Sequence, residues 1–195
     1  MNSKALVWHN PLTKPTEWTR WATGQTGFPL VDAALCELMK TGYCSNRVRQ
    51  NAASFLTKDL ELDWRAGAEW FQFLLEDFCV GANWGNWTYF SGVGSDPKQR
   101  HFRTVSQAKR YDVQGLYVSK WLPALVEREN HSVDGNTATP LIVEARLRPW
   151  DFLGDDTSGQ IWPPPLVDPR SQYTWQDLNQ LDEKGTLFAE DDDDK

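Results

Sequence analysis

The chain has 195 residues and a formal net charge of -7, with eleven tryptophans and three cysteines. This length suits one large domain or two small ones and allows a substantial buried core. Three cysteines without metal-ligand spacing argue against a disulfide framework or a zinc site and favour an intracellular setting, and the sequence lacks the run of about 18 apolar residues that a membrane span requires.

The charge is distributed unevenly along the chain. Residues 1–150 contain 17 Lys and Arg against 15 Asp and Glu, whereas residues 151–195 contain 3 against 12. The body is therefore slightly basic and the tail acidic, so the net charge does not exclude an anionic partner. The last five residues, DDDDK, form an acidic, tag-like end that has no bearing on the fold.

The predicted elements in the first third of the chain are two helices. Residues 1–20 contain Pro11 and Pro15 and are expected to form an irregular lead-in. From residue 26 to residue 42 the apolar residues follow a helical period, which begins near Pro29 and ends at Gly42. Ser45 or Asn46 can cap the next helix. We expect its buried face to comprise Val48, Ala52, Phe55, Leu56 and Leu60.

Three further helices are predicted. The third begins near Asp63, the fourth covers residues 83–90, and glycine and proline then mark a loop at residues 91–101. A last helix, near residues 119–125, precedes a proline-rich, acidic tail. No stretch alternates with a period of two. We therefore expect an all-α bundle, divided into the lead-in (1–20), a helical portion (21–130), an extended tail (131–190) and the acidic end (191–195).

One helix has an unexpectedly polar face. Asn46, Arg49 and Gln50 are spaced at i, i+3 and i+4, so they share one side of the second predicted helix. Asp77 supplies a carboxylate for Arg49, and Asn83 offers an amide at the start of another helix. Two interpretations remain open at this point. The face binds a polar ligand, or it forms an interhelical salt bridge with a capping asparagine.

Several long segments resemble a known family. They are WATGQTGFPLVDAAL (21–35), TGYCSNRVRQNAASFLTKDLELDWRAGAEWF (41–71), NWGNWTYFSGVGSDP (83–97) and YDVQGLYVSKWLPAL (111–125). Their wording is similar to the FAD-binding helical domain of the photolyase/cryptochrome family, and most similar to its cryptochrome-DASH branch. The likeness runs from Trp8 to Leu125 and, less closely, to WPPPLVDP (162–169).

The resemblance implies that the polar face holds FAD. By position, Arg49 and Asp77 resemble the ion pair against the isoalloxazine ring, and Asn83 resembles the amide opposite the flavin N5. The remaining implied cofactor contacts are Asn46 and Tyr43. An amide at N5 would tune the protonation of the ring, and a buried Arg-Asp pair would set its electrostatics without exposing charge to water.

The sequence departs from the family in two respects. Cys79 stands where the family usually has a second aspartate that hydrogen-bonds the cofactor, and a thiol is a weak acceptor. The amino-terminal α/β antenna domain and the first flavin-binding segment have no counterpart here, so the chain resembles only the carboxy-terminal part of a full-length member. We expect it to need that amino-terminal half, or a larger assembly, as a partner and to be inactive alone.

The resemblance also implies an electron route. Trp87 and Trp64 occupy the positions of the first two members of the tryptophan chain that reduces photoexcited flavin, and Trp8 is the candidate for the third. Without the resemblance, Trp64 and Trp87 would be interpreted as ordinary core residues.

A basic segment follows the fourth predicted helix. Residues 96–110 contain five Lys and Arg, among them Lys98 and Arg100, against one acid, with Phe102 interleaved. Phosphate neutralisation beside an exposed aromatic suits single-stranded nucleic acid, although a solvated basic loop is the alternative. The resemblance implies contacts with a flipped-out pyrimidine dimer and with phosphates. The residues in these positions are Gln50 and Tyr89 for the dimer, and Arg47 and Arg103 for the phosphates.

Together, these features predict the FAD-binding portion of a DASH-type cryptochrome or DNA photolyase, which uses blue light to repair cyclobutane pyrimidine dimers in single-stranded DNA or to sense light. The alternatives are a non-catalytic module that serves as a binding or structural subunit without flavin, and a nucleic-acid binder without flavin. The resemblance allows a plastid, a mitochondrion or the nucleus as the compartment.

Overall fold

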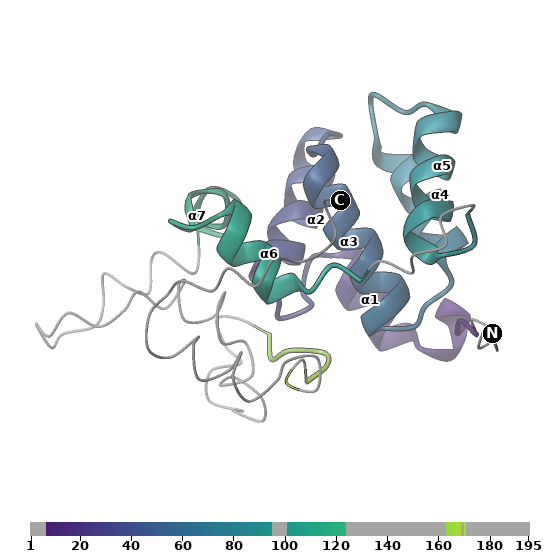
Figure 1. Cartoon of the computed structure of the whole chain (residues 1–195), viewed down its shortest axis with the longest axis horizontal. Helices are drawn as coiled ribbons and strands as arrows, with labels where there is room; N and C mark the ends of the chain where they lie inside the picture. Colours follow the sequence, from purple (N-terminus) through teal and green to yellow (C-terminus); the bar gives the residue numbers. More distant parts are fainter. Residues whose placement is uncertain (1–6, 95–100, 124–162, 169, 171–195) are drawn as a thin grey trace, which may run out of the picture.

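The computed structural model describes residues 7–94, 101–123, 163–168 and 170. Figure 1 shows helices as the regular elements of this part of the chain. In chain order they are a 3-10 turn η1 (Pro11–Thr13), α1 (Pro15–Ala22), α2 (Pro29–Thr41), α3 (Asn46–Ser54), a π-helical segment η2 (Phe55–Asp59), α4 (Trp64–Leu74), α5 (Val80–Ser91), α6 (Thr104–Tyr111) and α7 (Leu116–Trp121). Within the described ranges, the β-structure is an isolated parallel bridge between His9 and Leu62. The predicted all-α architecture is confirmed.

The helix α2 has the ends that its sequence predicts. Pro29 lies at its first position, where a missing N–H costs nothing, and Gly42 ends it in the left-handed conformation at φ 68°. Asp32 is fully buried in its first turns and accepts hydrogen bonds from Thr26 N at 2.7 Å and Gly27 N at 2.9 Å. These bonds fix the loop that leads into α2.

The next helix begins regularly and widens at its end. α3 continues into η2, where Leu60 N donates to the carbonyl oxygen of Phe55 at 3.1 Å, five residues earlier. π-helical turns of this kind are rare and occur frequently at functional sites. The predicted apolar stripe is confirmed, because its members are all buried: Val48, Ala52, Phe55, Leu56 and Leu60.

α4 and α5 form a helix pair, and α5 packs against α3. Asp63 caps α4 by accepting a hydrogen bond from Arg65 N at 3.0 Å, and Gly92 ends α5 at φ 83°. α5 packs against both α4 and α3, and α2 packs against α3 and α7. α4 and α5 come very close at Gly67, which faces the Trp87 ring. This packing brings α3 and α5 face to face.

Two predictions about the helices were wrong. Residues 15–20 were expected to be irregular, but they belong to α1, because proline is well tolerated at the first position of a helix. The alternative interpretation of residues 96–110 as a solvated basic loop is wrong for residues 104–110, because they belong to α6, which buries Thr104, Val105, Gln107 and Ala108. Most of the predicted tail (131–190) lies outside the described residues.

A short proline-rich segment packs against the amino-terminal helices. Leu166 N donates to the carbonyl oxygen of Thr26 at 2.9 Å, and Arg20 donates to the carbonyl oxygen of Pro164. Gly27 is in the left-handed conformation at φ 80°, and a side chain there would collide with Pro165. Among the described helices, none has the length and apolar character that crossing a bilayer demands.

Candidate functional site

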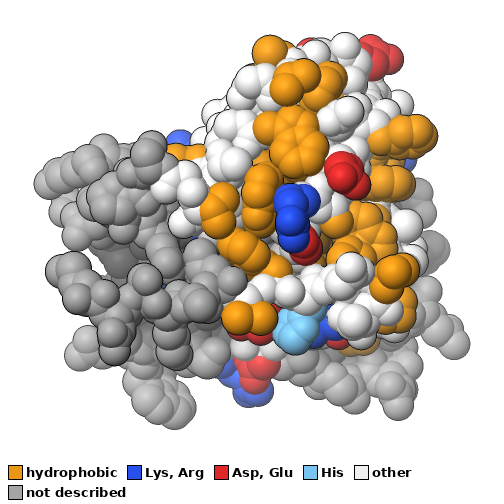
Figure 2. Space-filling view, turned by 90° about the vertical axis from the view of Figure 1, so that its right-hand side faces the viewer, with side chains coloured by type: hydrophobic (Ala, Val, Ile, Leu, Met, Phe, Trp, Pro, Cys, Tyr) orange, Lys and Arg blue, Asp and Glu red, His pale blue; other side chains and the backbone are white. Residues whose placement is uncertain are grey.

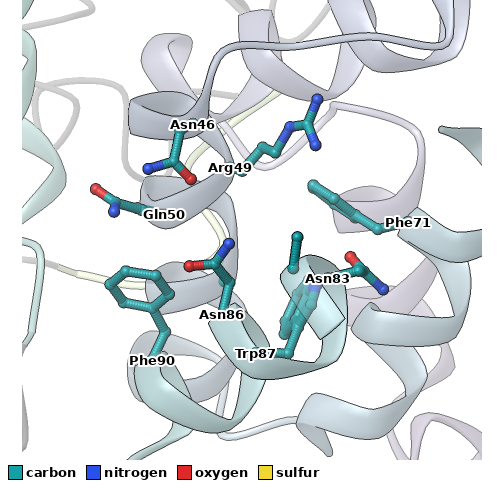
Figure 3. A pocket seen from close by; sticks show the side chains of 10 residues that line it. Asn46, Arg49, Gln50, Phe71, Asn83, Asn86, Trp87 and Phe90 are labelled. Carbon is teal, nitrogen blue, oxygen red and sulfur yellow. The ribbon is translucent and has the colours of Figure 1, made fainter. Parts of the chain in front are cut away.

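A cavity lies between α3 and α5, with one wall from α4 (Figure 3). Its volume is about 330 Å³ including the space open to solvent, and its lining residues are Asn46, Arg49, Gln50, Ala53, Phe71, Ala82, Asn83, Asn86, Trp87 and Phe90. The enclosed part is much smaller, about 30 Å³, so a ring system placed here would also occupy the space that is open to solvent.

Helical spacing explains why these residues meet. On α3 the lining residues Asn46, Arg49, Gln50 and Ala53 are spaced at i, i+3, i+4 and i+7, and α5 repeats this spacing from Asn83 to Phe90. The polar face predicted on α3 therefore faces the cavity. The prediction omitted Asn86 and Phe90, although counting i+3 and i+7 from Asn83 would have found both.

The Arg49 side chain is held by three groups. Its Nη2 donates to both carboxylate oxygens of Asp77 at 3.0 and 2.9 Å, and its Nε donates to the Cys44 carbonyl oxygen at 2.6 Å. The guanidinium also lies 5.3 Å from the ring centroid of Tyr43. The pairing of Arg49 with Asp77 is as predicted. This arrangement fixes a positive charge on the wall of the cavity.

The expected burial of this ion pair was wrong. The Asp77 side chain is 48% exposed and the Arg49 side chain 22%. Asp77 lies in the turn before α5, at one end of the cavity, rather than on a helix that faces inward. Water therefore screens the pair, and its contribution to stability is small.

Asn83 lies in the buried first turns of α5. Its Nδ2 donates to the Ala68 carbonyl oxygen of α4 at 2.9 Å, which leaves the oxygen Oδ1 as the atom available to a ligand. The interpretation of Asn83 as a capping residue was wrong, because the cap of α5 is Cys79, which is exposed and makes no capping side-chain bond. Asn83 thus links α5 to α4.

The rest of the wall combines aromatic rings with amides. The rings of Phe71, Trp87 and Phe90 are at most 2% exposed and form an apolar surface. The carboxamides of Asn46, Gln50 and Asn86 make no side-chain hydrogen bond within the part of the chain that the structure describes. Figure 3 shows the amides of Gln50 and Asn86 on opposite walls. Such a cavity fits a flat, partly polar ring.

The three predicted electron-route tryptophans occupy different environments. Trp87 is buried in the cavity wall, and its ring centroid lies 5.3 Å from that of Phe71. Trp64 begins α4, and its ring centroid lies 5.9 Å from that of Trp84. Trp8 precedes His9, which bonds to Glu61 and Asp63 just before Trp64. The backbone of Trp8 is therefore close to that of Trp64, and the roles of all three remain predictions.

Some of the residues predicted to contact nucleic acid have described contacts with one another or with aromatic rings. Arg47 lies 4.4 Å from the Tyr111 ring centroid and 5.9 Å from that of Phe102. Phe102 was expected to be exposed, but it is buried against Phe90 at 5.3 Å because its backbone N–H donates to Ser54 Oγ. Among the other predicted contacts, Tyr89 is half-buried and Arg103 is exposed. Lys98 and Arg100 lie outside the described residues.

Comparisons with known proteins identify a matching family and several relatives. Residues 2–176 match the family described as the FAD-binding domain of DNA photolyase. A cryptochrome DASH from Gloeobacter violaceus is 56% identical over 113 residues, which cover 56% of this chain and 23% of the relative. The chain therefore spans less than a quarter of that protein's length.

Two solved structures are similar over most of the chain. The Synechocystis cryptochrome has a TM-score of 0.70 at 36% identity, covering 92% of this chain and 34% of that one. The photolyase from Sulfolobus tokodaii, whose structure holds two FAD molecules, has a TM-score of 0.69 at 25% identity, covering 91% of this chain and 36% of that one.

Proposed function

Because the chain belongs to the family of the FAD-binding domain of DNA photolyase, we propose that the cavity between α3 and α5 holds the flavin ring of FAD in a DASH-type cryptochrome or DNA photolyase. The protein then uses blue light to transfer an electron to a cyclobutane pyrimidine dimer in single-stranded DNA, or to sense light. One observation carries the proposal: Arg49 and the oxygen of Asn83 are presented by the two facing helical stripes that line the cavity.

The residues present fit this cofactor. Its ring has two flat apolar faces and an edge of N–H and C=O groups. The cavity offers aromatic walls together with amides that, apart from Asn83, make no side-chain hydrogen bond to the described residues. The hydrogen bond to Ala68 orients the Asn83 amide so that Oδ1 can accept from an N–H of the ring. Arg49 supplies a fixed positive charge for an electron-rich ring.

When bound, FAD supplies light absorption and one-electron transfer. The chain's own residues do three things for it. Asn83 would accept a hydrogen bond from a ring N–H, Arg49 would stabilise negative charge on the ring, and Phe71 and Trp87 would exclude water from one side. Asp77 keeps the Arg49 guanidinium in place through its two oxygens.

The proposed substrate enters beside the cofactor. Gln50 and Tyr89 contact a flipped-out pyrimidine dimer, and Arg47 and Arg103 contact phosphates. Extrusion of the dimer costs a few kcal/mol, and it costs less from a single strand. The stacking of Arg47 on Tyr111 supports its part, because it holds the guanidinium in one place on the surface of α3.

A further protein segment completes this site in our proposal. At the end of the cavity where Arg49 lies, its contact partners Tyr43 and Asp77 are 50% and 48% exposed. The solved relatives are about three times as long as the matched part, since the chain covers 34% of one of them. We propose that the remainder of a photolyase fold covers this end, in the same polypeptide or in a partner.

A flavin-free binding module is the second candidate function. It is favoured by Cys79, which is exposed at the start of α5 and offers no carboxylate there. The test is to add FAD to the purified protein, remove free cofactor, and record the visible absorbance of what remains bound. We expect retained flavin in the unmodified protein and in Gly85→Ala, and loss of flavin in Asn83→Leu. A protein that stays colourless with intact helical circular dichroism, both alone and when co-expressed with the remainder of a photolyase fold, would refute the flavin proposal and leave the binding module.

A further inference from the structure

Four indole rings form a line that begins at the cavity. The Trp87 ring lines the cavity, and its centroid lies 6.2 Å from that of Trp21 in α1. Trp21 lies 5.5 Å from Trp18, and Trp18 lies 6.3 Å from Trp70 of α4. These separations are those of aromatic rings in direct packing contact.

The line runs from a dry environment to solvent. Trp21 is fully buried, and its indole N–H donates to the Ala52 carbonyl oxygen at 3.2 Å, which fixes the ring. Trp18 and Trp70 are half-buried at the edge of the core. Trp70 stacks at 6.1 Å on Phe73, which is 79% exposed. Figure 2, seen from the side where α4 and α5 lie, shows apolar side chains over much of this face.

The second tryptophan of the predicted route packs elsewhere. The ring partner of Trp64 is Trp84, at 5.9 Å, whereas the ring partners described for Trp87 are Trp21 and Phe71. Among the described residues, Trp21 is therefore the indole in direct ring contact with the cavity-lining tryptophan.

We propose that Trp21 and Trp18 conduct electrons to a flavin in the cavity, as a branch separate from Trp64. This inference rests on the proposed function. One electron passes from Trp87 to the photoexcited oxidised flavin, one from Trp21 refills Trp87, and one from Trp18 refills Trp21. The net result is a flavin reduced by one electron and a Trp18 oxidised by one. The oxidised indole releases its N–H proton to water, and a thiol in solution then returns one electron and one proton to it; the resulting thiyl radicals couple to a disulfide.

Phenylalanine substitutions test the branch, because phenylalanine preserves an aromatic ring but is much harder to oxidise than tryptophan. In FAD-loaded protein, Trp21→Phe and Trp18→Phe should each lower the rate of blue-light flavin reduction to about half or less, as expected when one of two donor routes to the cofactor is removed. Trp121→Phe is the matched control, because Trp121 packs on a separate apolar cluster around Val118.

A second readout is independent of turnover. Under light without reductant, lasting oxidation at Trp18 should be found by peptide mass spectrometry in the unmodified protein and should disappear in Trp21→Phe. A merely structural role for Trp21 would not move the site of oxidation. If Trp21→Phe does not fold, the rate of flavin reduction in Trp18→Phe still tests the branch, because Trp18 is only half-buried and its replacement should be tolerated.

A tethered photo-oxidant separates the two proposals. A thiol-reactive flavin can be attached to the exposed Cys79, in a Cys36→Ser background that leaves Cys44 buried and unreactive. If the protein does not retain FAD, the proposed function fails, but light-dependent oxidation of Trp18 by the tethered flavin still supports the branch. Flavin reduction that is unchanged in both Trp21→Phe and Trp18→Phe, together with unchanged oxidation of Trp18 in Trp21→Phe, would overturn the branch.

Discussion

The side-chain nitrogen of Asn83 donates a hydrogen bond to the carbonyl oxygen of Ala68 at 2.9 Å, which joins α5 to α4 in the buried wall of the cavity. This bond also decides which atom of the amide remains for a ligand. Fold and site therefore depend on the same side chain, and the two contributions can be measured separately.

Replacing Asn83 with Leu should destabilise the protein by about 1–3 kcal/mol, because a buried carbonyl oxygen loses its partner. Urea unfolding measures the change. Asn86→Ala is the control, since Asn86 lies on the same stripe without a side-chain hydrogen bond to the described residues, and it should change stability by less than about 0.5 kcal/mol. Equal stabilities for the two variants would show that the Ala68 bond contributes nothing.

Two glycines test the close packing of α4 on α5. Gly67→Ala would place a methyl group against the Trp87 ring and Leu56, so it should cost about 1–3 kcal/mol and shift the tryptophan fluorescence. Gly85→Ala meets no atom within 4 Å and should instead stabilise α5 by about 0.5–1 kcal/mol. Thermal unfolding of both variants gives the comparison. A Gly67→Ala protein as stable as the parent would contradict the crossing at this residue.

The buried Asp32 predicts a pH dependence of stability. Burial raises the pKa of its carboxyl to about 7, even though Thr26 and Gly27 donate hydrogen bonds to it and Arg20 is nearby. Its pKa in the unfolded chain is about 3.9, so between pH 4 and pH 7 the unfolded chain is ionised while the folded one is still protonated. The unfolded state then binds fewer protons, and stability falls as the pH rises through this window.

Asp32→Asn should remove this slope. Its stability at low pH will be lower than that of the parent, because an amide N–H would face the donors at Thr26 and Gly27. The decisive quantity is therefore the difference in slope between pH 4 and pH 7 in urea titrations. Parallel curves for the two proteins would show that Asp32 does not titrate as described.

Local signals were enough to predict most of the helices. Pro29 and Gly42 bracket a regular apolar period, and the structure places α2 between them. The same residue type misled at Pro15, where proline was interpreted as punctuation although it starts α1. A helix begins at Pro15 because Trp18 and Trp21 can pack into the core. That core is formed by residues 30 to 70 positions later in the chain, which local signals do not reveal.

The site was predictable as far as helical spacing determines it. One wall followed from Asn46, Arg49 and Gln50, whereas the assignment of Asn83 came from family resemblance. Burial could not be predicted in this way. Phe102 is buried because its ring packs on Phe90 and its backbone N–H bonds to Ser54 Oγ. Asp77 is exposed because it lies in a turn. Both outcomes depend on contacts between segments that are distant in sequence.

The Arg49–Asp77 pair gives the prediction that separates binding from stability. Because Asp77 is 48% exposed, Arg49→Ala should change the free energy of unfolding by only about 0–1 kcal/mol. Its effect on FAD should be larger, about tenfold weaker binding or more, because a charge-assisted contact of roughly 1.5–3 kcal/mol is lost. Arg49→Lys is the matched control. The lysine keeps the charge but cannot bond to both Asp77 oxygens and the Cys44 carbonyl oxygen. The FAD affinity of Arg49→Lys should therefore lie between those of the parent and Arg49→Ala. Fluorescence titration with FAD measures the affinities and urea unfolding the stabilities. If Arg49→Ala bound FAD as tightly as the parent at equal stability, the positive charge on α3 would have no part in holding the cofactor, and the pair would be a surface link between α3 and the turn before α5.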